Sequence, residues 1–380
     1  MMKKFVYYPI TQSHLILSSI LRDYNSSSCN SIILDELFFT KNFINKISEN
    51  SNWDKVYVIK KHSKLKDYIY KNILYKQVYS DIFQLQNVNL VIYSFGDHFT
   101  NTVINSIYGD NNILLGEDGI FPYYGVDVIK QYYDFAYRSS IKNKLKVLVK
   151  RIVNRKSKFD AGKIDKLLVM NAEWLPREVI LKYKIEQLEF GKKAIDSAFD
   201  ELTTLYGYKR KHSTYAVDIV FFDSGLFGNG AAEESEWFDV LLNVFNQFQG
   251  MRIFIKLRPT RNNKVFEFYN ELQKKTSSHL LFDSEESKYP WEIIYYNNVS
   301  ELENVIFMGM SFSTAFISSK KYFNIEHNIV SLRNIFVTER MKHVGLYYEK
   351  SDFIERVKET CISKSILTPS TFDDVNNFKT

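Results

Sequence analysis

Two adjacent carboxylates, Glu117 and Asp118, carry the first chemical signal in the sequence. They lie in the segment 116–119, which reads Gly-Glu-Asp-Gly and directly follows an apolar run at 113–115 that predicts a buried strand. In open α/β sheets, ligands bind where the strands end. A carboxylate in such a place can take the proton of a reacting hydroxyl, although the same four residues also fit an ordinary turn between strands.

A second motif, Lys-Leu-Arg-Pro at 256–259, follows the apolar run 253–255 of another strand candidate. Lys256 and Arg258 therefore bring positive charge to a sheet edge, where it suits a phosphate group. Arginine stays protonated near neutral pH, so Arg258 can hold a leaving phosphate with forked hydrogen bonds but cannot donate a proton to it. A nucleoside monophosphate can leave as a dianion, since its second pKa is about 6. The alternative interpretation is an exposed arginine before the turn residue Pro259.

Three hydroxyl side chains follow an apolar run at 305–309 and precede a second apolar run, which is typical of a strand, a loop and a helix. A helix N-terminus with capping hydroxyls binds phosphate, and the same hydroxyls also serve as plain helix caps. These residues are Ser311, Ser313 and Thr314.

Glu292 stands in the segment Tyr-Pro-Trp-Glu at 289–292. One carboxylate can accept hydrogen bonds from both hydroxyls of a ribose. An acidic residue in the first turn of a helix is also favoured by the helix dipole, so both interpretations stay open.

A glycine-containing loop at 224–230 includes Gly228 and lets backbone amides approach a donor molecule. The loop lacks the Gly-Lys-Ser/Thr ending of a P-loop, so ATP hydrolysis is not expected. The first strand candidate is not followed by Gly-x-Gly-x-x-Gly, which argues against a standard dinucleotide oxidoreductase.

The order and spacing of these motifs resemble the bacterial sialyltransferases and polysialyltransferases of the lipooligosaccharide and capsule families. The shared signatures of those families are an acidic-acidic-Gly motif, a Lys-x-His-Pro motif, a Pro-x-Glu segment and a Ser/Thr pair. Arg258 stands where they have the histidine that is assigned the acid role. The replacement indicates electrostatic stabilisation in place of proton donation, a changed donor or a lost activity.

The resemblance implies an α/β protein of the GT-B class, with two Rossmann-like domains facing a cleft. The C-terminal domain would hold the nucleotide, and the N-terminal domain would present the acceptor. The expected reaction is an inverting, metal-independent transfer of a CMP-activated sugar, expected to be sialic acid, to a hydroxyl of a bacterial lipooligosaccharide or capsule glycan. The substrates are thus a nucleotide-sugar donor and a glycan acceptor, without a separate cofactor.

Each matching residue receives a role from the resemblance. Glu117 or Asp118 would deprotonate the acceptor hydroxyl, and Glu292 would bind the ribose. The residues expected at the donor phosphate or beside it are Lys256, Arg258, Pro259, Ser311, Ser313, Thr314 and Gly228. Two alternatives remain open: a transferase with another nucleotide-sugar or alditol-phosphate donor, and a non-catalytic glycan-binding or assembly protein.

The elements that must position these groups alternate along the chain. Strand candidates at 5–8, 31–34, 56–59, 90–93 and 113–115 are separated by polar or helical stretches, and a helix is predicted at 13–21. After the polar, basic segment at 206–214 the pattern starts again, with a strand at 217–222, a helix at 235–248 and a strand at 252–256. The pattern predicts parallel sheets with helices on both faces.

The length of 380 residues suits two domains better than one. We expect a Rossmann-like acceptor domain at 1–205, a linker at 206–216 and a Rossmann-like nucleotide-sugar domain at 217–380. Hydrophobic residues make up 45% and charged residues 25%, which is typical of a folded soluble protein.

Cys29 and Cys361 stand near opposite ends of the chain, so neither a disulfide framework nor a zinc site is expected. No Asp-x-Asp motif indicates a metal, and the apolar start is interrupted by polar residues, so no signal peptide is predicted. Without a long apolar segment, no membrane-spanning helix is expected. We predict a cytoplasmic protein, with peripheral contact at the inner membrane face as an alternative.

That alternative rests on the segment 141–159, which has eight basic residues and no acidic ones. Its apolar residues recur at helical spacing, so a basic amphipathic helix that includes Lys150 and Arg151 is expected. Such a helix can contact an anionic membrane surface or an anionic glycan, or simply pack on the core with its basic side in water. No nucleic-acid partner is expected. His98, which follows the strand candidate at 90–93, is a reserve candidate for acceptor contact or for replacing the histidine that the motif at 256–259 lacks.

Overall fold

The computed structural model forms two compact units, Met1–Gly207 and Tyr208–Thr380. The boundary between them falls inside the segment 206–216 named above as the linker. The structure describes residues 2–61, 75–93, 103–104, 107, 109, 111–117, 123, 161–209, 216–223, 233–258, 263–310, 314–336, 353–360 and 364–376.

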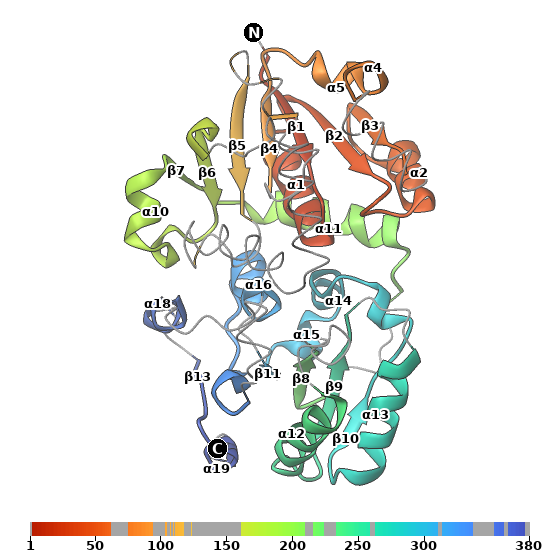
Figure 1. Cartoon of the computed structure of the whole chain (residues 1–380), viewed down its shortest axis with the longest axis vertical. Helices are drawn as coiled ribbons and strands as arrows, with labels where there is room; N and C mark the ends of the chain where they lie inside the picture. Colours follow the sequence, from red (N-terminus) through yellow and green to blue (C-terminus); the bar gives the residue numbers. More distant parts are fainter. Residues whose placement is uncertain are drawn as a thin grey trace, which may run out of the picture. The chain divides into compact units, whose positions relative to one another are not determined.

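Unit 1 contains a seven-stranded sheet in the order β3-β2-β1-β4-β5-β6-β7, and every pair of neighbours is parallel (Figure 1). The predicted alternation of strands and helices is confirmed. β1 lies between β2 and β4, so the order of the chain across the sheet reverses there. The strands are β1 (Lys4–Tyr8), β2 (Cys29–Asp35), β3 (Lys55–Ile59), β4 (Asn89–Ile92), β5 (Asn112–Gly116), β6 (Lys166–Val169) and β7 (Ile185–Gln187).

The helices of unit 1 follow the strands that they connect. α1 begins where the side chain of Thr11 accepts a hydrogen bond from the backbone N–H of His14. It packs against α11, and the Arg22 guanidinium donates two hydrogen bonds to the Glu201 carboxylate, at 2.9 and 2.7 Å. The helices are α1 (Gln12–Tyr24), α2 (Lys41–Asn50), α4 (Tyr75–Val78), α5 (Ser80–Phe83), η1 (Ala161–Lys163), η2 (Ala172–Trp174), α10 (Arg177–Lys182) and α11 (Lys192–Tyr206).

Unit 2 repeats this topology with a six-stranded parallel sheet in the order β10-β9-β8-β11-β12-β13. The order reverses at β8, which lies between β9 and β11. The predicted strand at 252–256 coincides with β9. The strands are β8 (Ile219–Phe222), β9 (Arg252–Lys256), β10 (His279–Leu281), β11 (Ile306–Gly309), β12 (Ile329–Ser331) and β13 (Ile366–Leu367).

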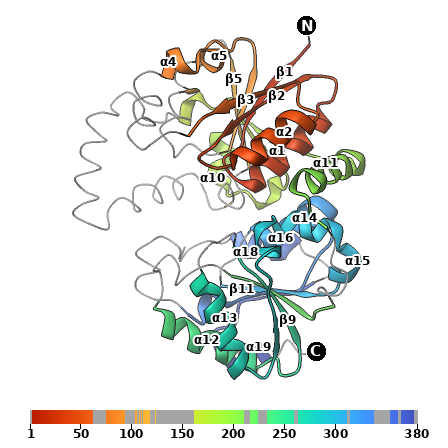
Figure 2. The ribbon, with the colours of Figure 1, turned by 90° about the vertical axis from the view of Figure 1, so that its right-hand side faces the viewer.

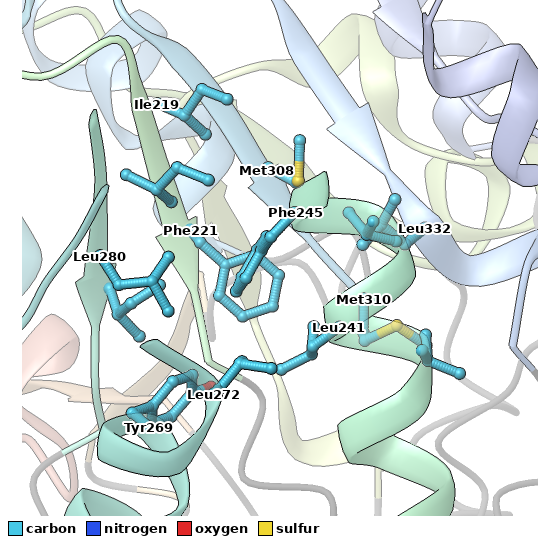
Figure 3. Packing of buried hydrophobic residues seen from close by; sticks show 14 of the residues in the cluster. Ile219, Phe221, Leu241, Phe245, Tyr269, Leu272, Leu280, Met308, Met310 and Leu332 are labelled. Carbon is cyan, nitrogen blue, oxygen red and sulfur yellow. The ribbon is translucent and has the colours of Figure 1, made fainter. Parts of the chain in front are cut away.

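Helices cover both faces of the second sheet (Figure 2). On one face, Phe221 of β8 packs edge to face against Phe245 of α12, with ring centroids 5.2 Å apart (Figure 3). On the other face, Phe222 packs against Trp291 of α14 and Phe316 of α16. The helices are α12 (Glu234–Asn246), α13 (Asn263–Lys275), η3 (Glu286–Lys288), α14 (Trp291–Asn297), α15 (Val299–Leu302), α16 (Thr314–Phe323), η4 (Leu332–Asn334), α18 (Phe353–Thr360) and α19 (Phe372–Asn376).

This burial explains why the strands read as continuous apolar runs. Successive side chains of a strand point to opposite faces, so a strand covered on both sides needs apolar residues at every position. All four residues of β8 are buried. The unbroken apolar signal therefore reports a sheet covered on both faces, and the chemically active groups must lie beyond the ends of its strands.

Candidate functional site

The carboxyl edge of the second sheet gathers several buried polar side chains, two of them at the ends of β8 and its neighbour β9, where the strand order reverses. Asp223 directly follows β8, Lys256 is the last residue of β9, and Ser331 is the last residue of β12. All three are buried. Because the strands are parallel, their carboxyl ends lie at one edge, and such an edge is the usual ligand site of an open α/β sheet.

Lys256 joins the end of β9 to the helical turn η3. Its Nζ donates hydrogen bonds to the carbonyl oxygens of Leu257, at 2.9 Å, and Ser287, at 3.4 Å. Only 6% of the residue is exposed. This burial lowers the pKa of the ammonium to about 8, although the charges of Glu292 and Glu286 act in the opposite direction.

Glu292 lies in the first turn of α14 and is 5% exposed. Burial raises the pKa of its carboxyl group, whereas its own backbone N–H and the charges of Lys321 and Lys256 act to lower it. Lys321 comes from α16 and is itself buried. We call Lys256, Glu286, Glu292 and Lys321 the buried charge cluster, which contains two cations and two carboxylates from four elements.

Hydrogen bonds from α13 and to β9 hold Asp223 in place. Its Oδ1 accepts a hydrogen bond of 2.9 Å from the hydroxyl of Tyr269 on α13, and its backbone N–H donates to the carbonyl of Lys256 at 3.1 Å. Burial and then the charge of Asp223 raise the pKa of the Tyr269 hydroxyl. The Asp223 backbone is therefore held at the end of β9, and its carboxylate is held by Tyr269 of α13.

The structure thus brings together Lys256 and Glu292 among the residues predicted for the donor. Arg258 is exposed, two positions beyond the end of β9. Thr314 is the first residue of α16, and α16 follows β11 as the strand, loop and helix pattern predicted. Pro259, Gly228, Ser311 and Ser313 lie outside the described residues, as does the side chain of Thr314.

In unit 1, Glu117 directly follows β5 and is 2% exposed. Its Oε2 accepts a hydrogen bond of 2.9 Å from the backbone N–H of Met170, which follows β6. Burial and then the charge of Glu117 raise the pKa of the Tyr123 hydroxyl. The Glu117 carboxylate therefore ties the ends of two neighbouring strands together. Asp118, His98, Lys150 and Arg151 lie outside the described residues.

A second group in unit 1, absent from the sequence prediction, surrounds Tyr93 just beyond β4. The Tyr93 ring stacks on His14, with centroids 4.8 Å apart, and its hydroxyl pairs with Ser18 Oγ at 2.7 Å. A Cβ atom at Gly116 would come within 2.5 Å of this ring. The glycine before Glu117 is thus explained by the close approach of an aromatic ring to the end of β5.

Sequence reasoning also missed Asp223, Glu286 and Lys321. Asp223 carried a usable signal, because it directly follows the apolar run of β8. Glu286 and Lys321 carried none, since each lies among other polar residues and is buried only by the fold. Within the ranges that the structure describes, no group of three His, Cys, Asp or Glu side chains is arranged to hold a metal ion. In the same ranges, no helix is long and apolar enough to cross a membrane.

No known family model matches the sequence, and no curated protein is recognisably similar to it. The structure is similar to that of S. aureus MnaA in a complex with UDP, at a TM-score of 0.52 and 9% identity, covering 99% of this chain and 87% of that one. It also matches UDP-GlcNAc 2-epimerase from Methanocaldococcus jannaschii (TM-score 0.46, 10% identity, 99% and 91% covered) and Acinetobacter baumannii MurG (0.40, 9%, 99% and 89%).

The likeness to MnaA extends over nearly the whole chain and agrees with the two parallel sheets. It shows a two-domain, Rossmann-like GT-B fold, as the sequence predicted. At this sequence identity the likeness concerns the fold alone, so the chemistry has to be argued from the residues of this chain.

Proposed function

We propose that this protein is a glycosyltransferase that uses a nucleotide sugar and binds the donor nucleotide at the carboxyl edge of the second sheet. The observation that carries the proposal is the buried charge cluster, which lies where an open α/β sheet binds ligands and includes Lys256 and Glu292. The GT-B fold is consistent with this use. In this reading Glu292 faces the ribose hydroxyls.

The reaction has one bond formed and one bond broken. The acceptor hydroxyl oxygen attacks the anomeric carbon of the sugar, and the bond between that carbon and the phosphate oxygen breaks. The electron pair leaves with the phosphate, and the hydroxyl proton moves to a carboxylate base. Single displacement inverts the configuration at the anomeric carbon and needs a base on one side and stabilisation of phosphate charge on the other.

We assign the base to Asp118. Of the two adjacent carboxylates, Glu117 is buried and already accepts the backbone N–H of Met170. This contact suits Glu117 to fixing the end of β5, which leaves proton removal to its neighbour. The assignment makes the two residues unequal: one would position the loop, and the other would react.

Phosphate stabilisation is assigned to Arg258 together with the hydroxyls of Ser311, Ser313 and Thr314. Arg258 is exposed and follows β9, so its guanidinium is accessible to a ligand at this edge. Its planar fork matches two phosphate oxygens. The arginine would neutralise the leaving group by charge, where the resembling families use a histidine.

Two observations point to different donors. The motifs resemble enzymes that use CMP-activated sialic acid, whereas the similar MnaA structure holds UDP. We propose a CMP-activated sugar, with sialic acid as the substrate and a lipooligosaccharide or capsule glycan as the acceptor, and a UDP sugar as the competing donor. The basic segment 141–159 would hold the acceptor or the membrane surface on which it is carried.

The test is a thermal-shift panel with CMP, CDP, UDP, GDP and ADP, followed by donor-hydrolysis assays. A ligand that binds only the folded protein raises its melting temperature, and a concentration of 100 times Kd stabilises it by about 2.7 kcal/mol. A shift specific to CMP supports the proposed donor, and a shift specific to UDP indicates that the donor is a UDP sugar instead. If none of the nucleotides shifts the transition, the proposal is wrong and a non-catalytic glycan-binding role takes its place.

A further inference from the structure

The ammonium of Lys256 reaches the segment that leads into α14, and this contact gives Lys256 a role that the motif did not predict. We propose that Lys256 is a positioning residue for the nucleotide: its hydrogen bond to the Ser287 carbonyl holds the segment 283–292 against β9 and so places the Glu292 carboxylate for the ribose. The inference rests on the proposed function, because it assumes that a nucleotide occupies this edge. It replaces direct contact between Lys256 and phosphate.

The hydrogen bonds of the segment support this role. Within it, the Ser287 N–H donates to the Asp283 carbonyl at 3.1 Å, and Ser287 Oγ donates to the Ser284 carbonyl at 2.7 Å. The segment is therefore folded on itself, and Lys256 Nζ adds the link from the Ser287 carbonyl to β9. α14 begins at Trp291, with no side-chain hydrogen bond from its cap residue Pro290. The start of α14, which carries Glu292, is thus located by what holds the segment before it.

The hydrogen bonds of Lys256 argue against direct phosphate contact. Its ammonium already donates to two carbonyl groups of the protein, at Leu257 and Ser287. Arg258, two residues further on, is exposed and suited to that contact. The two cations of the motif would therefore have different roles: Arg258 binds the phosphate, and Lys256 positions Glu292 for the ribose of the nucleoside.

The electrostatics of the cluster indicate function rather than stability. An ammonium removed from water is unfavourable unless it is paired, and buried ion pairs are often replaced by apolar residues without loss of stability. Here the cation faces Glu286 of η3 and Glu292 of α14, while Lys321 of α16 acts on Glu292 as well. A purely structural contact between β9 and η3 would not need these charges.

The experiment compares Lys256→Met with Lys288→Met, using the full-length protein. Lys288 belongs to the same turn, is 61% exposed and pairs with Glu285, so it controls for loss of a lysine in this segment. Hydrogen exchange of the free protein should become faster across 283–292 in Lys256→Met and stay unchanged in Lys288→Met. Unchanged exchange in Lys256→Met would overturn the positioning role, whether or not any nucleotide binds.

Calorimetry then measures the binding of CMP, 2′-deoxy-CMP and cytidine, with the uridine set in parallel. If Lys256 positions Glu292 for the ribose, Lys256→Met should raise the Kd of CMP and the Kd of cytidine by the same factor, about tenfold. The preference of the wild type for CMP over its deoxy form should disappear in Lys256→Met and in Glu292→Gln. Weakening of CMP alone, with cytidine unaffected, would instead show direct phosphate contact and overturn the inference.

Two further measurements keep the test decisive. If Lys256→Met does not fold, Lys256→Arg takes its place, because it retains the charge and should keep part of the preference for CMP over 2′-deoxy-CMP. Complete loss of that preference in a folded Lys256→Arg with normal hydrogen exchange would contradict the inference. In the wild type, the ribose preference should fall between pH 7 and pH 9 as Lys256 loses its proton, since its pKa is about 8. If the wild type binds none of these ligands, the proposed function and the ribose role both fail, while the exchange experiment still reports on the segment.

Discussion

The two units share the order of their first six strands but differ in what lies at the carboxyl edges of their sheets. In unit 1, the buried carboxylates of Asp35 and Glu117 each accept a backbone N–H, from Leu37 at 2.8 Å and from Met170 at 2.9 Å. In unit 2, cations and carboxylates are buried together around Lys256. The same topology therefore presents backbone-bound carboxylates in one unit and a mixed charge cluster in the other.

This difference shows which part of the chemistry the topology supplies. A parallel sheet whose strand order reverses supplies the location of a ligand site, and the residues after each strand decide what can bind there. Carboxylates that are satisfied by the backbone shape loops, whereas buried charges of both signs leave an electrostatic field for a polar ligand. We therefore assign the nucleotide to unit 2 and the acceptor to unit 1.

The largest expected effect tests this division. Asp118→Asn should lower the rate of sugar transfer by about 10²- to 10⁴-fold, the usual contribution of a general base, and leave the nucleotide Kd unchanged. Glu292→Gln should instead raise the nucleotide Kd. Steady-state kinetics and calorimetry on both variants separate the two effects.

Asp81→Asn is the matched control, because Asp81 is an exposed aspartate of unit 1 that pairs with the surface residue Lys55. It should behave like the wild type. Loss of nucleotide binding in Asp118→Asn would contradict the assignment of separate roles to the two units.

The second effect is a pH dependence of the free energy of unfolding, caused by the buried charge cluster. Burial lowers the pKa of Lys256 from 10.5 to about 8, so between these values the unfolded chain binds a proton that the folded protein has lost. Stability rises with pH wherever the unfolded state binds more protons. The wild type should therefore gain stability relative to Lys256→Met from pH 8 to pH 10.5, by up to about 3 kcal/mol. Urea denaturation of both proteins across this range measures the difference, and parallel curves would contradict it.

The third prediction compares two glycines that each end a strand, Gly116 of β5 in unit 1 and Gly309 of β11 in unit 2. A Cβ at Gly116 would lie 2.5 Å from the Tyr93 ring, which is held by Ser18 and His14, whereas at Gly309 it would lie 3.0 Å from the Phe316 ring and 3.2 Å from the Phe222 carbonyl. Gly116→Ala should destabilise the protein by about 2 kcal/mol, as overpacking of a core does. Gly309→Ala should have a smaller effect, and urea denaturation of both variants provides the comparison. An equal or reversed order would mean that the Tyr93 ring yields more easily than its contacts suggest.

The fold was predictable because its strands are buried on both faces. β9 reads as an apolar run with a basic residue at each end, and its predicted bounds are those of the structure. The positions of candidate groups at strand ends followed from the same runs, which is why Glu117 and Lys256 were found at sheet edges. Local pattern is sufficient for this, because each strand reports its own burial.

The partners of those groups were not predictable, because they depend on how distant segments meet. Glu117 binds a backbone group 53 residues away, and Lys256 reaches a carbonyl 31 residues away. The stacking of His14 on Tyr93 likewise joins the first helix to the end of β4. A sequence motif shows that a charge lies at an edge, but only the fold shows whether that charge meets a ligand or the protein itself.

The smallest effect concerns the residue where the two units meet in the chain. Gly207 ends α11 with a φ of 69°, in the left-handed region, and its N–H donates to the Thr204 carbonyl at 3.0 Å. Because a side chain is strained in this conformation, Gly207→Ala should destabilise the protein by about 1 kcal/mol. Gly191→Ala, at the other end of the same helix, is the control: its φ is −68° and no atom lies within 4 Å of the added Cβ. Thermal denaturation measures the difference: Gly207→Ala should lower the melting temperature more than Gly191→Ala does. Since α11 packs on α1 of unit 1, Gly207→Ala should reduce protection from hydrogen exchange in unit 1. Reduced protection confined to β8 and β9 would show instead that Gly207 stabilises unit 2.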